Sequence, residues 1–103
     1  MLQLGQKQLK GRVTLDVLVR IEGAMGCGIV KVAQRLQEGD LRINDILGIL
    51  TPVIRAGGND IDQKDVGAAV WEAGLAEGMR CAGEILALAL TAGEAGNDEP
   101  ANQ

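Results

Sequence analysis

The sequence predicts a mainly α-helical fold: a small bundle of about five short helices, with a short β-hairpin or ordered arm at residues 1–13. Apolar residues recur at the spacing of an amphipathic helix in successive segments, and a glycine follows most of these segments. Hydrophobic residues make up 47% of the chain and aromatic residues 1%, so the core must be aliphatic. The 103 residues fit one domain. We place it at residues 1–92 and expect the acidic tail, residues 93–103, to be disordered.

The N-terminal segment alternates loosely between apolar and polar residues, which is typical of a short hairpin. Gly5 can form its turn, and residues 10–14 can form a strand. The first helix should begin after Thr14, whose hydroxyl can accept from free amides of the first turn, and end at Gly26. A second helix follows at residues 28–39. The apolar positions of the first helix are Leu15, Leu18, Val19, Ile21 and Met25.

The third predicted helix is the most apolar one in the first half of the chain, and Asn44 can cap it. Pro52 falls inside this helix and removes the backbone bond to the Gly48 carbonyl. The helix should therefore bend at Pro52 or restart with Thr51 as a cap. Its broad apolar face, which indicates a central position, consists of Ile46, Leu47, Ile49, Leu50, Val53 and Ile54.

The fourth predicted helix begins after a loop at residues 56–60. Asp62 can cap it, and Asp65 places negative charge in its first turn, where the helix dipole favours it. Its inner face consists of Val66, Ala69, Val70 and Ala73. Trp71 lies off this face, so it is either a lid over Gly74 and Gly78 or an anchor for a partner.

The last predicted helix runs from residue 75 to about residue 90. Glu77, Arg80 and Glu84 line one side at spacings of three and four residues and can form weak ion pairs. The other side carries Leu75, Met79, Ala82, Leu86 and Ala89, and the apolar surface is widened by Ile85, Leu88 and Leu90. This helix is therefore either central in the bundle or partly covered by a partner chain, which includes a second copy of the protein.

Composition disfavours several classes of function. The net charge is −4, and an acidic surface repels phosphate backbones, so we expect no nucleic-acid partner. The chain has no histidine, which removes the usual catalytic base and the commonest transition-metal ligand. We expect no enzyme activity, no cofactor and no metal. Because no run approaches the roughly 20 apolar residues of a membrane span, and no signal peptide is recognisable, we expect a cytoplasmic protein without membrane contact.

Glycines and acidic residues in two loops suggest ligand sites, but structural roles are favoured. Gly23, Gly26 and Gly28 follow a helix and lack the order of a dinucleotide fingerprint, so they indicate helix ends rather than a phosphate cradle. The acidic cluster around Asp60 lacks the glycine and the terminal glutamate of a calcium-binding loop, and Lys64 interrupts it. We interpret these acidic residues as helix caps.

The sequence favours structural roles for the two cysteines and for Glu22 of the first predicted helix. Cys27 lies in a glycine-rich corner without a base to activate it, and Cys81 lies in an apolar run typical of a core residue. A disulfide between them is an open possibility without support from the pattern. Glu22 is either a functional carboxylate or, as we favour, an acceptor for a neighbouring loop amide.

Five segments follow one another in a characteristic order: TLDVLVRIEGAMG, GIVKVAQRLQEG, INDILGIL, AGGNDI and DVGAAVWEAGL. In this order the chain resembles the small tail proteins of gene transfer agents and related siphophages over roughly residues 8–90. In that family a leucine-rich helix ends in Ile or Leu followed by Glu and a glycine, as at Ile21, Glu22 and Gly26 here. Pro52 and the short segment before Val13 depart from the family pattern.

The resemblance implies a tail assembly chaperone of the bacterial host cytoplasm. Such a protein binds tail proteins, either the tape-measure protein or the tail-tube protein, and has no catalytic residues. The alternatives are a structural tail component retained in the particle and a small helical regulatory module that binds proteins. From the surplus apolar surface of the last two helices, we predict partner binding by Trp71, Leu75, Met79 and Leu86.

Overall fold

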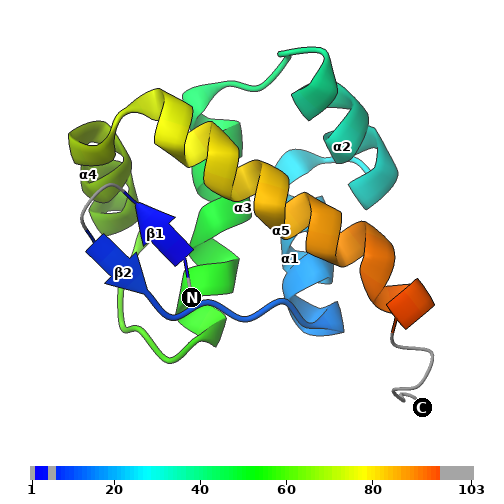
Figure 1. Cartoon of the computed structure of the whole chain (residues 1–103), viewed down its shortest axis with the longest axis horizontal. Helices are drawn as coiled ribbons and strands as arrows, with labels where there is room; N and C mark the ends of the chain where they lie inside the picture. The colour runs from blue at the N-terminus through cyan, green and yellow to red at the C-terminus, as the bar shows by residue number, and fades with distance from the viewer. Residues whose placement is uncertain (1, 5–6, 96–103) are drawn as a thin grey trace.

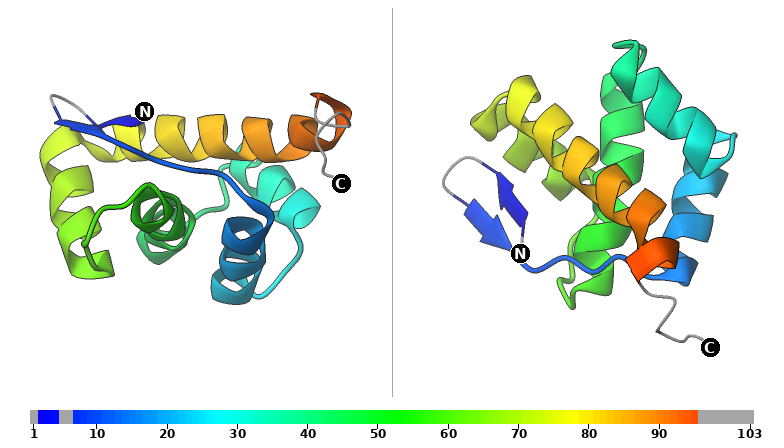
Figure 2. Two further views of the ribbon diagram at one scale, coloured as in Figure 1. Left: turned by 90° about the horizontal axis from the view of Figure 1, so that it is seen from below. Right: turned by 45° about the vertical axis from the view of Figure 1, so that its right-hand side comes forward.

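The computed structural model describes residues 2–4 and 7–95 and confirms the predicted fold class. Its elements are β1 (Leu2–Leu4), β2 (Lys7–Leu9), α1 (Leu15–Met25), α2 (Ile29–Gln37), α3 (Ile43–Ala56), α4 (Gln63–Ala73) and α5 (Leu75–Ala95). Figure 1 shows α5 crossing in front of α3, with α4 near one end of the molecule and α1 and α2 near the other. The left panel of Figure 2 shows α5 lying over a layer formed by α4, α3 and α1.

The predicted N-terminal hairpin is present, but its second strand is earlier than expected. β1 and β2 pair antiparallel, with Gln3 opposite Gln8, whereas residues 10–13 belong to no strand. The backbone N–H of Arg12 instead donates to the carbonyl of Val53 in α3 at 3.0 Å, so this segment is held by a helix rather than by a strand. Gly5, the predicted turn residue, lies outside the described residues.

The corner between α1 and α2 confirms the predicted helix ends. Thr14 Oγ1 accepts from the Val17 N–H at 3.2 Å, and Gly26 stops α1 with a φ of 73°, a conformation that favours glycine. Glu22 Oε2 accepts from the Ile29 N–H at 3.0 Å and so caps α2, whose own N-cap, Gly28, has no side chain. The interpretation of Glu22 as an acceptor for a neighbouring amide is confirmed.

The start of α3 differs from the prediction, because Arg42 and not Asn44 is its N-cap residue. Asp45 explains the earlier start. Its carboxylate accepts from the backbone N–H of Arg42 at 2.9 Å and forms an ion pair with Arg35 of α2, also at 2.9 Å. The helix continues through Pro52 to Ala56, so the alternative in which it restarts at Thr51 is wrong.

The hydrophobic core is aliphatic, as the composition predicts, and α3 contributes the largest share of it. The larger side chains that are almost completely buried are Leu4, Val17, Ile21, Val32, Ile49, Leu50, Val53, Ile54, Val66, Val70, Ile85 and Leu86. The cap on α4 is also as predicted, since Asp62 Oδ1 accepts from the Asp65 N–H at 3.0 Å. α5 extends to Ala95, so residues 93–95 of the predicted tail are helical, and residues 96–103 lie outside the described part.

Gly78 permits the close approach of α5 to α3 and α4. A β-carbon at this position would lie 3.0 Å from Val70 Cγ1 and 3.3 Å from Ile46 Cγ2, which is tight for carbon atoms. Gly23, in α1, has no such neighbour, because a β-carbon there would meet no atom within 4 Å. The two helical glycines therefore differ in the space around them.

Replacing Gly78 by leucine should destabilise the protein by about 1–3 kcal/mol, because the added carbons overpack the α3–α4–α5 junction. The same substitution at Gly23 is the control. It should leave stability unchanged or raise it slightly, since leucine favours a helix more than glycine does. Urea unfolding followed by circular dichroism measures both. Equal effects at the two positions would show that α5 does not pack as closely as described.

Candidate functional site

The structure brings two of the four predicted partner-binding residues to the surface. Trp71, in α4, is 79% exposed, and Leu75, the first residue of α5, is 40% exposed. Met79 is half-buried and packs against the core. Leu86 is only 2% exposed and belongs to the core, so its side chain is not available to a partner in the folded protein.

The position of Trp71 follows from the helical phase of α4. Val66, Ala69 and Val70 point into the core, which places Trp71 on the outer side of the helix. The nearest neighbours of a β-carbon at Gly78 would be Val70 and Ile46, so the indole is not the predicted lid over that glycine. Trp71 is therefore an exposed aromatic side chain on the surface. Its role as an anchor for a partner stays a prediction.

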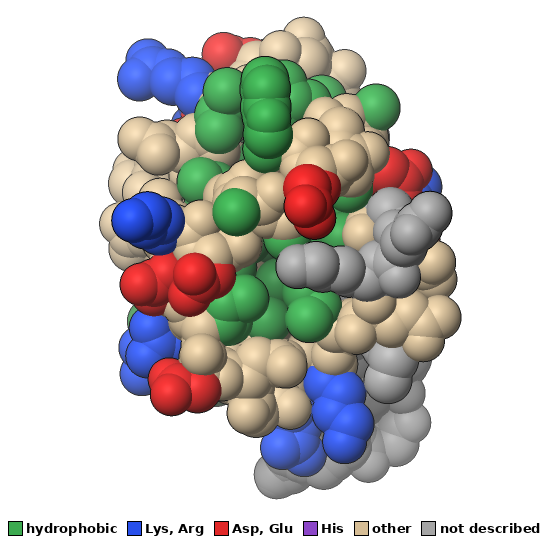
Figure 3. Space-filling model, turned by 90° about the vertical axis from the view of Figure 1, so that its left-hand side faces the viewer, with side chains coloured by type: hydrophobic (Ala, Val, Ile, Leu, Met, Phe, Trp, Pro, Cys, Tyr) green, Lys and Arg blue, Asp and Glu red, His purple; other side chains and the backbone are tan. Residues whose placement is uncertain are grey.

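An apolar surface surrounds the junction between α4 and α5. We define the α4–α5 apolar surface as the exposed residues Ala68, Trp71 and Leu75. Ala68 and Trp71 lie one helical turn apart, and Leu75 follows the turn at Gly74, whose φ is 101°. Figure 3 shows hydrophobic side chains gathered on the face of the molecule that carries α4, with charged side chains around them.

Other exposed apolar side chains lie on α1, at the starts of α2 and α3, and on the second half of α5. Leu15 and Val19 in α1 are 78% and 57% exposed, although both belong to the predicted apolar spacing of that helix. The buried residues of α1 are Ile21, which this spacing includes, and Val17, which it omits. Because α1 is apolar on two faces, periodicity alone did not distinguish its core side from its outer side. On α5, Leu88 helps to line a cavity of about 380 Å³ together with Glu84, Ala87 and Thr91.

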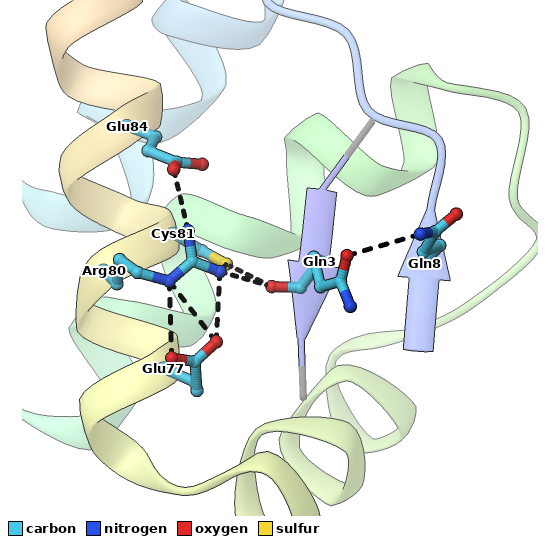
Figure 4. Close-up of polar contacts among 6 residues, drawn as sticks. All are labelled: Gln3, Gln8, Glu77, Arg80, Cys81 and Glu84. Atoms are coloured by element: carbon cyan, nitrogen blue, oxygen red, sulfur yellow. Dashed lines mark hydrogen bonds and ion pairs between the residues drawn. The ribbon is translucent and has the colours of Figure 1, made fainter. Parts of the chain in front are cut away.

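A polar cluster fastens the hairpin to α5 (Figure 4). Arg80 donates to the backbone carbonyl of Gln3 at 2.7 Å and forms ion pairs with Glu77 at 3.0 Å and Glu84 at 2.7 Å. The Cys81 thiol donates to the same Gln3 carbonyl at 3.2 Å. The predicted ion pairs along α5 are confirmed, and they orient the Arg80 guanidinium toward the Gln3 carbonyl of β1. The cluster therefore has a structural role, because it attaches the hairpin to α5.

The chemistry of the two cysteines fits a structural role. Both are free, so the structure contains no disulfide between them. Burial raises the pKa of the Cys81 thiol, which keeps it protonated and poorly nucleophilic near neutral pH. Cys27 is half-buried in the corner before α2. In residues 2–4 and 7–95, no group of three Cys, Asp or Glu side chains is arranged to hold a metal ion.

Comparison with known proteins gives one family. A family model described as "Phage tail tube protein, GTA-gp10" matches residues 1–92. No curated protein and no solved structure gives a significant match. Within the described residues, none of the helices combines the length and the apolar character needed to cross a bilayer.

Single substitutions should separate the surface residues from the core residue among the four predicted positions. Trp71→Ala should change the free energy of unfolding by no more than about 0.5 kcal/mol, because the indole packs against little. Leu86→Ala should cost about 2–5 kcal/mol, because it leaves a cavity in the core. Urea titration of both variants measures the difference. A large loss of stability in Trp71→Ala would contradict the exposed position of the indole.

Proposed function

The chain belongs to the phage tail tube protein family GTA-gp10, and from this premise we propose that it is a non-enzymatic tail assembly chaperone. Membership of this family gives the protein a phage tail-related role. In the proposed role it binds the tape-measure protein during tail assembly and then releases it as the tail is completed. The protein would act in the cytoplasm of the bacterial host.

The observation that carries this proposal is the α4–α5 apolar surface. Trp71 is the only aromatic residue of the chain, yet it lies outside a core that is built entirely from aliphatic side chains and cysteine. A contiguous exposed apolar patch indicates an interaction site, and tryptophan is enriched among the residues that dominate protein interfaces. An amphipathic client helix could place its apolar side chains around the indole and Leu75.

A structural component retained in the tail is the second candidate, and the description of the family as tail tube proteins favours it. A subunit of a ring or tube contacts its neighbours through two different surfaces. The exposed residues Leu15 and Val19 of α1 provide an apolar surface on a helix separate from α4 and α5. In this case the protein would be present in the finished particle.

Co-expression with the products of neighbouring genes, followed by affinity purification and mass spectrometry, tests the chaperone proposal. A chaperone should be recovered with a long helical tape-measure protein from cells and be absent from purified particles. A structural component should instead be present in purified particles in stoichiometric amounts. Detection in particles at the same level as the main tail proteins would contradict the chaperone proposal.

A pair of double variants tests the binding surface. Trp71→Ala with Leu75→Ser should lower recovery of the client at least tenfold, because anchor residues of an interface contribute about 2 kcal/mol or more each. Leu15→Ala with Val19→Ser is the matched control, since it removes another exposed apolar pair, which lies on α1. Its recovery of the client should match that of the unmodified protein. Loss of the client only in the α1 variant would show that the surface is wrongly placed.

A further inference from the structure

A groove with a positive charge runs along the second half of α3, in contrast to the acidic character of the whole chain. One cavity, of about 440 Å³, lies between α1 and α3 and is lined by Arg20, Arg55 and neighbouring residues. A second cavity, of about 310 Å³, is lined by Lys10, Arg12 and the end of α3. Ala56 lines both cavities, so they adjoin. We call this the basic groove.

The charges of the basic groove are poorly balanced. Its lining carries four cationic side chains, those of Lys10, Arg12, Arg20 and Arg55, and a single carboxylate, Asp16. Asp16 pairs with Arg20 at 3.0 Å. Within the described part of the chain, no carboxylate oxygen lies within 4.0 Å of a side-chain nitrogen of the other three cations. The groove therefore has a net charge of +3 in a protein whose net charge is −4.

We propose that the acidic C-terminal segment of the same chain, residues 96–103, docks in the basic groove. The segment carries two carboxylates, those of Asp98 and Glu99, and no cationic side chain, so its charge is opposite to that of the groove. α5 ends on the side of the molecule that carries α1, which forms one wall of the groove (Figures 1 and 2). The eight residues after Ala95 can span about 26 Å when extended.

Attachment to the same chain makes this contact feasible although each exposed ion pair is weak. A short linker holds a tethered segment at an effective concentration in the millimolar range, so a millimolar affinity is sufficient to occupy the groove about half of the time. The floor of the groove includes apolar atoms of Val17, Pro52 and Ala56, which suit the side of a peptide better than a nucleic-acid backbone. An acidic segment of another tail protein would have to displace this tail from the groove.

Paramagnetic NMR on the full-length chain tests the proposal. The ¹⁵N-labelled protein carries Cys27→Ser and Ala101→Cys, with a nitroxide spin label on the new thiol. The amide signals of Arg20 and Arg55 should lose most of their intensity, whereas that of Trp71, in α4, should keep it. Addition of NaCl to about 1 M, where the Debye length is about 3 Å, should restore the lost signals.

Neutralising the tail provides the matched comparison. Asp98→Asn with Glu99→Gln should restore the signals, whereas Glu38→Gln with Glu72→Gln, which removes two exposed carboxylates outside the groove, should not. Unchanged signals in the spin-labelled protein would overturn the proposal. Equal broadening in a mixture of spin-labelled ¹⁴N chains with ¹⁵N chains that carry no spin label would also overturn the proposal, because the docked segment would then come from a second copy. A spin-label effect that survives neutralisation of the tail would overturn the role of charge.

Discussion

The burial of α3 among α1, α4 and α5 is the constraint on which the rest of the fold depends. Along this helix almost every side of the middle section is buried, from Ile46 to Ile54. A helix that is apolar on all sides must be covered on all sides. No single neighbouring helix can cover α3 in this way, so several helices must pack around it. Each surrounding helix therefore packs one face against α3 or α5, and its opposite face remains exposed to solvent. The α4–α5 apolar surface lies on such an outer face, whereas the basic groove lies where α1 meets the second half of α3.

Features that depend on neighbouring residues could be predicted from the sequence. Thr14, Gly26 and Asp62 were correctly assigned as helix ends, because a cap satisfies backbone groups within one turn of itself. The prediction was wrong where a residue distant in the sequence determines the end of a helix. The start of α3 moved from Asn44 to Arg42 because Asp45 bonds the Arg42 amide while pairing with Arg35, a residue of another helix.

The candidate site was predictable only in part, because the tertiary packing exposes some of the four predicted residues and buries others. Trp71 was recognised as lying off the inner face of its helix, and its exposure follows from that phase. Leu86 was assigned to the same surface, but its side chain belongs to the hydrophobic core, because α5 is packed against several other elements. The basic groove was not predicted at all. Its cations come from the N-terminal segment, α1 and α3. The packing of α1 against α3 and the hydrogen bond from the Arg12 amide to the Val53 carbonyl bring them together.

The joint between the hairpin and α5 has a consequence for the order in which the protein can fold during synthesis. The carbonyl of Gln3 accepts hydrogen bonds from Arg80 and Cys81, which are 77 and 78 residues later in the chain. The hairpin therefore leaves the ribosome before the five helices but cannot make this contact until α5 has been synthesised. A two-stranded hairpin has little stability by itself, and closing so long a loop carries an entropic cost. The hairpin residues are thus synthesised before the helices but are among the last to reach their native contacts, and they complete the bundle only after α5 has formed.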